Sequence, residues 1–173
     1  MRFGDFLKAT VLLNAGAATL LAALTVIGLT REPERSLTVF SALWWTGAFL
    51  IGVWLGRRAE ASPPIARLLA TARTQTTLPE LRPGVTLLNR LWSLLLITLA
   101  AAVASVFLPQ VAAVAAGFPI ILALTLRRQE AAVSAIEQRD AARFYVDRTS
   151  PLQPIRLVRT PGFGGAFLRH PVT

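Results

Sequence analysis

Groups that could carry acid–base, nucleophilic or metal chemistry are few in this sequence. There is no cysteine, which excludes thiol nucleophiles, disulfides and thiolate metal sites, and the single histidine, His170, lies three residues from the C-terminus. Glu137 and Asp140 have the spacing of a helical carboxylate pair, but Arg139 and Arg143 flank them, which indicates a salt-bridged helix face. We therefore predict no catalytic residue, no metal site and no cofactor, and a protein that is not an enzyme. A lipid enzyme remains an alternative only if a partner supplies the catalytic groups.

The long apolar segments contain polar side chains but no charged ones. A charged side chain in a bilayer costs at least about 2.5 kcal/mol and usually marks an ion or proton path, so its absence argues against a proton relay. Asn14 lies in the first apolar segment, and Trp44 and Trp45 lie inside the second. These three side chains form a possible intramembrane polar site. Pro119 should kink the fourth apolar segment or leave a backbone carbonyl there without a helical donor. The three side chains could line a substrate path together with this kink, or they could bond to a neighbouring helix.

Small residues recur at four-residue intervals and predict close helix packing. Ala48, Gly52 and Gly56 form one such series, and Ala113 and Gly117 form another. The spacing does not say whether the partner helix belongs to this chain, to a second copy or to another protein. Packing within the chain is the simplest interpretation.

The elements that carry these residues are membrane spans. Of the 173 residues, 54% are hydrophobic and 16% are charged, and the mean hydropathy is +0.55. Uncharged runs predict spans at 9–29, 37–56, 88–108 and 111–126, of which the third begins before Arg90 and is charge-free from Leu91. Each is near the length that crosses a hydrocarbon core of about 30 Å. The first run exceeds the roughly 7 to 15 apolar residues of a signal peptide, so we expect an uncleaved helix. We predict an all-α, polytopic membrane protein with a four-transmembrane-helix bundle.

The basic residues predict the orientation of the chain. Arg31 and Arg35 lie in the loop between the first two spans, and every other Lys and Arg lies on the opposite side. Because cationic loops stay in the cytoplasm, we expect both termini on the cytoplasmic side. The membrane that we expect is the plasma (inner) membrane. This explains the net charge of +9 without nucleic-acid binding.

The remaining segments are expected in the cytoplasm. Ser62 and two following prolines predict the start of a surface helix over 63–74, and the absence of Pro and Gly over 127–147 predicts a cytoplasmic helix that extends the fourth span. We thus expect a transmembrane domain over 1–147 and a basic, Pro/Gly-rich, irregular tail over 148–173. The arginines expected to contact a partner or anionic lipid are Arg127, Arg128, Arg148, Arg156, Arg159 and Arg169.

A short stretch at the start of the third span, Leu88–Trp92, carries the residues Asn89-Arg90-Leu91-Trp92. It resembles an Asn-Arg-x-Trp signature in small four-helix proteins linked to translocation of polyprenyl-bound sugars. The resemblance covers five of the 173 residues and assigns no family.

Two functions are compatible with these features. The first is a non-catalytic membrane subunit or assembly factor of a larger complex, which docks partners through its arginine-rich cytoplasmic helix and tail. The alternative is a small oligomeric channel, flippase or transporter. The expected partners are the bilayer, anionic lipid and either a membrane protein or a second copy of the chain.

Overall fold

The structure is a computed structural model that describes residues 1–31, 34–57, 60–74, 83–147 and 153–161. It is mostly helical. Four segments are long and apolar enough to cross a membrane: α1 (Phe3–Arg31), α2 (Arg35–Leu55), α4 (Pro83–Ala104), and α5 (Pro109–Leu126) with its continuation α6 (Gln129–Arg139). The prediction of a multi-pass membrane protein with four apolar helices is confirmed.

The helix ends differ from the predicted spans. α1 begins at Phe3 rather than at residue 9, and α4 runs from Pro83 to Ala104 rather than over 88–108. The predicted limits followed the charge-free runs, whereas a helix continues through charged residues wherever its backbone bonds are satisfied. The first turns of α1 are held by burial of Phe3 and Phe6 in the larger of the two apolar cores.

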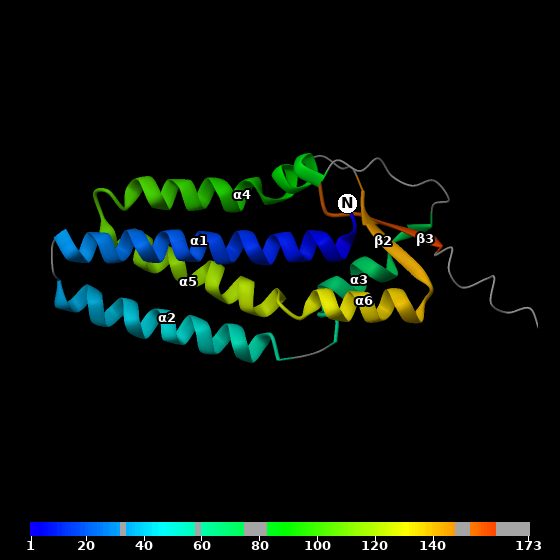
Figure 1. Cartoon of the computed structure of the whole chain (residues 1–173), viewed down its shortest axis with the longest axis horizontal. Helices are drawn as coiled ribbons and strands as arrows, with labels where there is room; N and C mark the ends of the chain where they lie inside the picture. Colours follow the sequence, from blue (N-terminus) through cyan, green and yellow to red (C-terminus); the bar gives the residue numbers. More distant parts are fainter. Residues whose placement is uncertain (32–33, 58–59, 75–82, 148–152, 162–173) are drawn as a thin grey trace, which may run out of the picture.

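The long helices pack around α5. α5 contacts α1 and α2 extensively, and α4 contacts α1 and α5 less extensively. In Figure 1, α1 and α5 lie between α2 on one side and α4 on the other. α4 is the least buried of the four segments. Within the protein, 11% of its apolar stretch is buried, against 33% for the segment formed by α5 and α6.

The small-residue series on α2 packs within the chain. Ala48, Gly52 and Gly56 are buried, and a Cβ added to Gly52 would lie 2.8 Å from the Cβ of Leu124 on α5. A Cβ on Gly56 would overlap the carbonyl oxygen of the same leucine. Glycine is therefore what lets α2 and α5 approach so closely.

A small α/β lobe lies at one end of the helix bundle, where α1 begins and α5 ends (Figure 1). We use this name for α3 (Pro63–Ala70), α6 and a three-stranded sheet of β1 (Arg73–Thr74), β2 (Ala142–Val146) and β3 (Leu157–Pro161). The strand order is β1-β3-β2, with β1 parallel and β2 antiparallel to β3. The N-terminus joins the outer edge of β2 through a bridge between Arg2 and Tyr145, and the Val146 N–H donates to the Met1 carbonyl.

The predicted helix over 127–147 is wrong in its second half. Arg127 and Arg128 separate α5 from α6, α6 ends at Arg139, and Ala141 has a positive φ of 46° that starts a strand. The strand is β2, in which Phe144, Tyr145 and Val146 are buried. These aromatic and β-branched residues favour a sheet once β3 is there to pair with them.

The all-α prediction is therefore wrong for the lobe. The predicted irregular tail supplies β3, whose residues Leu157 and Val158 are buried, while 148–152 and 162–173 lie outside the described residues. The predicted surface helix ends at Ala70 rather than residue 74, and its Ile65 and Leu69 are covered by protein rather than by the membrane surface. They share the lobe core with Phe3, Phe6, Leu7, Val133, Phe144, Val146 and Leu157.

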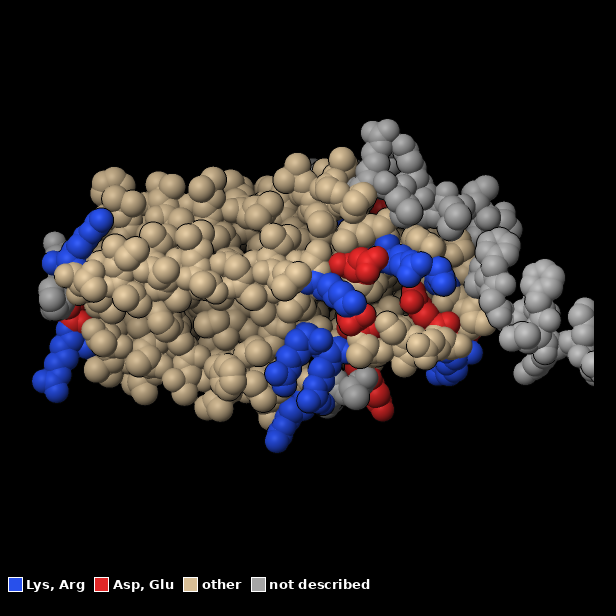
Figure 2. Space-filling view, in the orientation of Figure 1, with Lys and Arg blue, Asp and Glu red and all other residues tan. Residues whose placement is uncertain are grey.

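Charged side chains gather at the two ends of the molecule. Figure 2 shows Lys, Arg, Asp and Glu at the loop between α1 and α2 and around the lobe, with an uncharged band between them on the face in view. Many large apolar side chains on this length of the helices are exposed, including Leu43 at 69% and Ile97 at 65%. An exposed apolar band between charged ends is the surface expected of helices that cross a bilayer.

Candidate ligand cavity in the helix bundle

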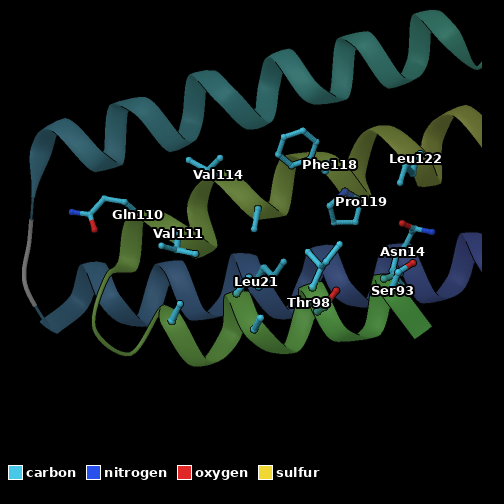
Figure 3. Close-up of a pocket in the computed structure, with 16 residues that line it drawn as sticks. Asn14, Leu21, Ser93, Thr98, Gln110, Val111, Val114, Phe118, Pro119 and Leu122 are labelled. Atoms are coloured by element: carbon cyan, nitrogen blue, oxygen red, sulfur yellow. The ribbon is translucent and has the colours of Figure 1, made fainter. Parts of the chain in front are cut away.

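A cavity of about 1010 Å³ lies between α1, α4 and α5, and it is open to the surface of the bundle, since lining residues such as Ile97 and Phe118 are exposed. Figure 3 shows the side chains that line it, which come from these three helices. The lining is largely aliphatic and aromatic, and no charged residue belongs to it. Its polar members are Asn14, Ser93, Thr98 and Gln110.

The sequence of α4 leaves space for the cavity. Ser93, Ile97, Ala101 and Ala104 lie three or four residues apart, so they share one face of α4, and all four line the cavity. Three of the residues that α4 contributes are alanines, at positions 100, 101 and 104. Since alanine has a single methyl group, the α4 wall is shallow where α1 and α5 present larger side chains such as Leu21 and Phe118.

Asn14 is the most buried polar residue of the lining, with 1% of its surface exposed. Its Nδ2 donates to the carbonyl of Thr10 at 2.8 Å, one turn earlier in α1. Its Oδ1 is buried and finds no hydrogen-bond partner among the described residues. Because a carbonyl can only accept, the bond to Thr10 fixes the amide with Nδ2 toward its own helix and leaves Oδ1 as a free acceptor.

Pro119 supplies a second polar feature of the wall. It is buried within α5, and because it has no N–H it cannot donate to the carbonyl of Ala115 one turn earlier. Both residues line the cavity. The sequence predicts this loss of a helical donor, but only the structure places it at the cavity.

The two deep tryptophans do not line this cavity. The Nε1 of Trp44 donates to the carbonyl of Val114 at 3.0 Å, and the Nε1 of Trp45 donates to the carbonyl of Ala113 at 2.9 Å. Gly117 lies under the Trp44 indole, which a Cβ there would overlap. Of the two interpretations of these tryptophans, the structure favours bonding to a neighbouring helix.

Four of the six arginines expected to contact a partner or anionic lipid are described, and they lie at or beside the lobe and do not line the cavity. Arg127, Arg128 and Arg156 are exposed, and Arg128 Nη1 donates to the carbonyl of Arg57 at 3.2 Å. Arg159 is half-buried in β3, with its Nη2 3.5 Å from the Asp140 carbonyl. Arg148 and Arg169 lie outside the described residues.

The acidic pair of α6 is used structurally. Glu137 Oε1 accepts the Phe144 N–H at 2.9 Å, which ties α6 to β2. Asp140 pairs with Arg139 at 2.9 Å; this hydrogen bond holds the pKa of Asp140 below its usual range. In the part of the chain that the structure describes, no cluster of His, Asp and Glu has the arrangement of a metal site. His170 is outside that part.

The sequence predicts that Asn14 and Pro119 could line one path, but it groups them with the two tryptophans and not with Ser93 and Gln110. The sequence pattern that could have predicted the cavity is the set of three alanines that share a face of α4 with Ser93, because small residues on one face leave space beside a neighbouring helix. Comparison with models of known protein families, with curated proteins and with solved structures finds no match to this chain.

Proposed function

We propose that the protein binds a membrane-soluble amphiphile between α1, α4 and α5 and carries it as a small lipid transporter or flippase. The observation that supports this best is the cavity itself. Its volume of about 1010 Å³ matches the upper end of the roughly 300–1,000 Å³ typical of ligand pockets, which are mostly apolar with a few convergent polar groups.

Two further properties favour a lipid-like ligand over an ion. The lining has no charged residue, whereas ion paths use charged rings or converging carbonyl groups. α4, which forms one wall, is the least buried of the four long helices. A wall with few protein contacts can separate from α1 and α5 at small cost, which would admit a ligand from the bilayer.

The proposal is tested by filling the cavity. Ala100 lines the cavity and is exposed, so a phenylalanine side chain in Ala100→Phe should have room to reach into the space without disturbing the helix contacts. Val103→Phe is the matched control, because Val103 lies on the same helix, is 58% exposed and is not part of the lining. Native mass spectrometry of protein from native nanodiscs should show bound lipid in wild type and V103F and much less in A100F. Equal lipid in all three, with no movement of labelled lipid in liposomes, would reject the proposal.

A second candidate is the non-catalytic subunit or assembly factor. It is supported by the exposed Arg127 and Arg128 at the junction of α5 and α6, where they could meet an acidic partner. Purification of wild type and of the double variant R127Q/R128Q at native expression level distinguishes the candidates. A stoichiometric partner lost from the double variant favours the subunit, and a particle containing only this chain and lipid favours the carrier.

A further inference from the structure

We propose that the ligand of the cavity is an uncharged amphiphile whose hydroxyl or amide group donates a hydrogen bond to Oδ1 of Asn14, with its apolar chain directed toward Gln110. This inference rests on the proposed lipid-binding function and specifies the chemical class of the ligand.

The acceptor is present at the cavity wall but covered by neighbouring side chains, which a ligand has to displace to reach it. Asn14 Oδ1 is buried and has no partner among the described residues, while Nδ2 of the same amide is held by the Thr10 carbonyl. A buried acceptor without a donor is unfavourable, and an apolar side chain of the same shape would avoid that cost. A ligand that brings an O–H or N–H to this point removes the deficit. A ligand without a donor leaves it in place.

The lining excludes a charged head group. None of its members carries a charge, and an ionised phosphate or carboxylate in an apolar site needs a compensating cation. Asn14 also lies eleven residues beyond the start of α1 at Phe3, a rise of about 16 Å along the helix. A group bonded there lies away from the basic residues of the lobe, so a neutral alcohol or amide suits the site.

The cavity has the length of one apolar chain. Its α5 wall extends from Gln110 to Leu122, a rise of about 18 Å, against about 15 Å for half of a hydrocarbon core. In Figure 3, Asn14 and Ser93 lie toward one end of the labelled lining and Gln110 lies at the other. The exposed Ser93 hydroxyl could bond to the same head group. Between these ends the labelled side chains are apolar apart from Thr98, which suits a chain with one polar end.

The test uses three probes that share one chain: hexadecanol, its methyl ether and hexadecyl phosphate. Each is titrated into the full-length protein in detergent, and the bound fraction is measured by native mass spectrometry. Wild type should bind the alcohol about fivefold more tightly than the ether, the value of one hydrogen bond, and the phosphate most weakly. In Asn14→Leu the alcohol-to-ether ratio should fall to about one. In Thr19→Leu, which removes a polar group at an exposed position of α1 outside the lining, the ratio should stay as in wild type.

Equal binding of alcohol and ether by wild type overturns the inference without reference to any variant, and so does tighter binding of the phosphate. Retention of the alcohol preference in N14L also overturns it, since another residue would then hold the head group. If wild type binds none of the three probes, the proposed lipid-binding function fails as well. Binding without preference leaves that function standing and rejects only the role of Asn14.

Discussion

Trp44 donates its indole N–H to the backbone carbonyl of Val114 at 3.0 Å, and this bond joins α2 to α5. Trp45 makes the equivalent bond to Ala113 at 2.9 Å. Two adjacent side chains thus bond to two adjacent carbonyls, which fixes the position of α2 along α5. The spacing of small residues indicates close packing, and the two indoles give it a defined register.

Replacement of Gly117 by alanine should destabilise the bundle, because the new Cβ would overlap the Trp44 indole. Overpacking of this kind typically costs about 1–3 kcal/mol. Gly47→Ala is the matched control, since a Cβ at Gly47 meets nothing within 4 Å and should be neutral or stabilising by about 0.5–1 kcal/mol. Thermal unfolding in one detergent measures both. A loss of the same size in both variants would contradict the packing argument.

Replacement of Trp45 by phenylalanine should remove the bond to Ala113 while keeping an aromatic ring. Hydrogen bonds between membrane helices average about 0.6 kcal/mol, with a maximum near 1.7. We therefore expect a loss within that range in a reversible unfolding experiment. Trp54→Phe is the control, because Trp54 is 66% exposed on the same helix, and it should have little effect. An unchanged stability in W45F would show that the bond is dispensable.

Replacement of Phe144 by alanine should open the lobe while the long helices stay folded. Phe144 is 2% exposed in the lobe core, and such a truncation costs about 3–5 kcal/mol. Hydrogen exchange should show faster exchange of the β2–β3 amides and unchanged exchange in α5. Arg143→Ala, at the exposed neighbouring position, should change stability by less than about 0.5 kcal/mol. Accelerated exchange throughout the chain would indicate that lobe and bundle unfold together.

The N-terminal amine should make stability depend on pH. Burial against the lobe lowers the pKa of the Met1 amine below its ordinary value of 8.0, although Asp5 partly opposes the shift. Just below pH 8 the unfolded chain therefore binds more protons than the folded chain, so stability should rise with pH between the folded pKa and about 8. Protein acetylated at the N-terminus should lack this rise in stability, because its amine no longer titrates. All other titrating groups are the same in the acetylated and unacetylated proteins. Identical pH profiles would rule out a contribution from the amine.

The expected orientation can be tested directly because the sequence has no cysteine of its own. We predict that a membrane-impermeant maleimide labels Ser36→Cys in intact cells and labels Gln138→Cys only after permeabilisation, because the basic lobe should lie in the cytoplasm. Both positions are exposed. Labelling of Q138C in intact cells would reverse the orientation and place both termini outside.

The sequence by itself determines the four apolar helices, since each must satisfy its backbone bonds internally and hydropathy over about 20 residues is a local property. It also determines the length of each charge-free run and the position of Arg31 and Arg35 between the first two runs. Asn14 and Pro119 could be named in advance, because an amide and a proline stand out in an apolar run.

Only the tertiary structure decided what these elements meet. Residues 142–146 form a strand rather than a helical turn because Leu157–Pro161 pairs with them, and that pairing depends on a partner beyond the local window. Ile65 and Leu69 are buried by the first turns of α1 and by α6 rather than by lipid, since an apolar face does not specify what covers it. The cavity likewise exists because α1, α4 and α5 bring Asn14, Ser93 and Pro119 to one space, and a volume between helices is set by their packing.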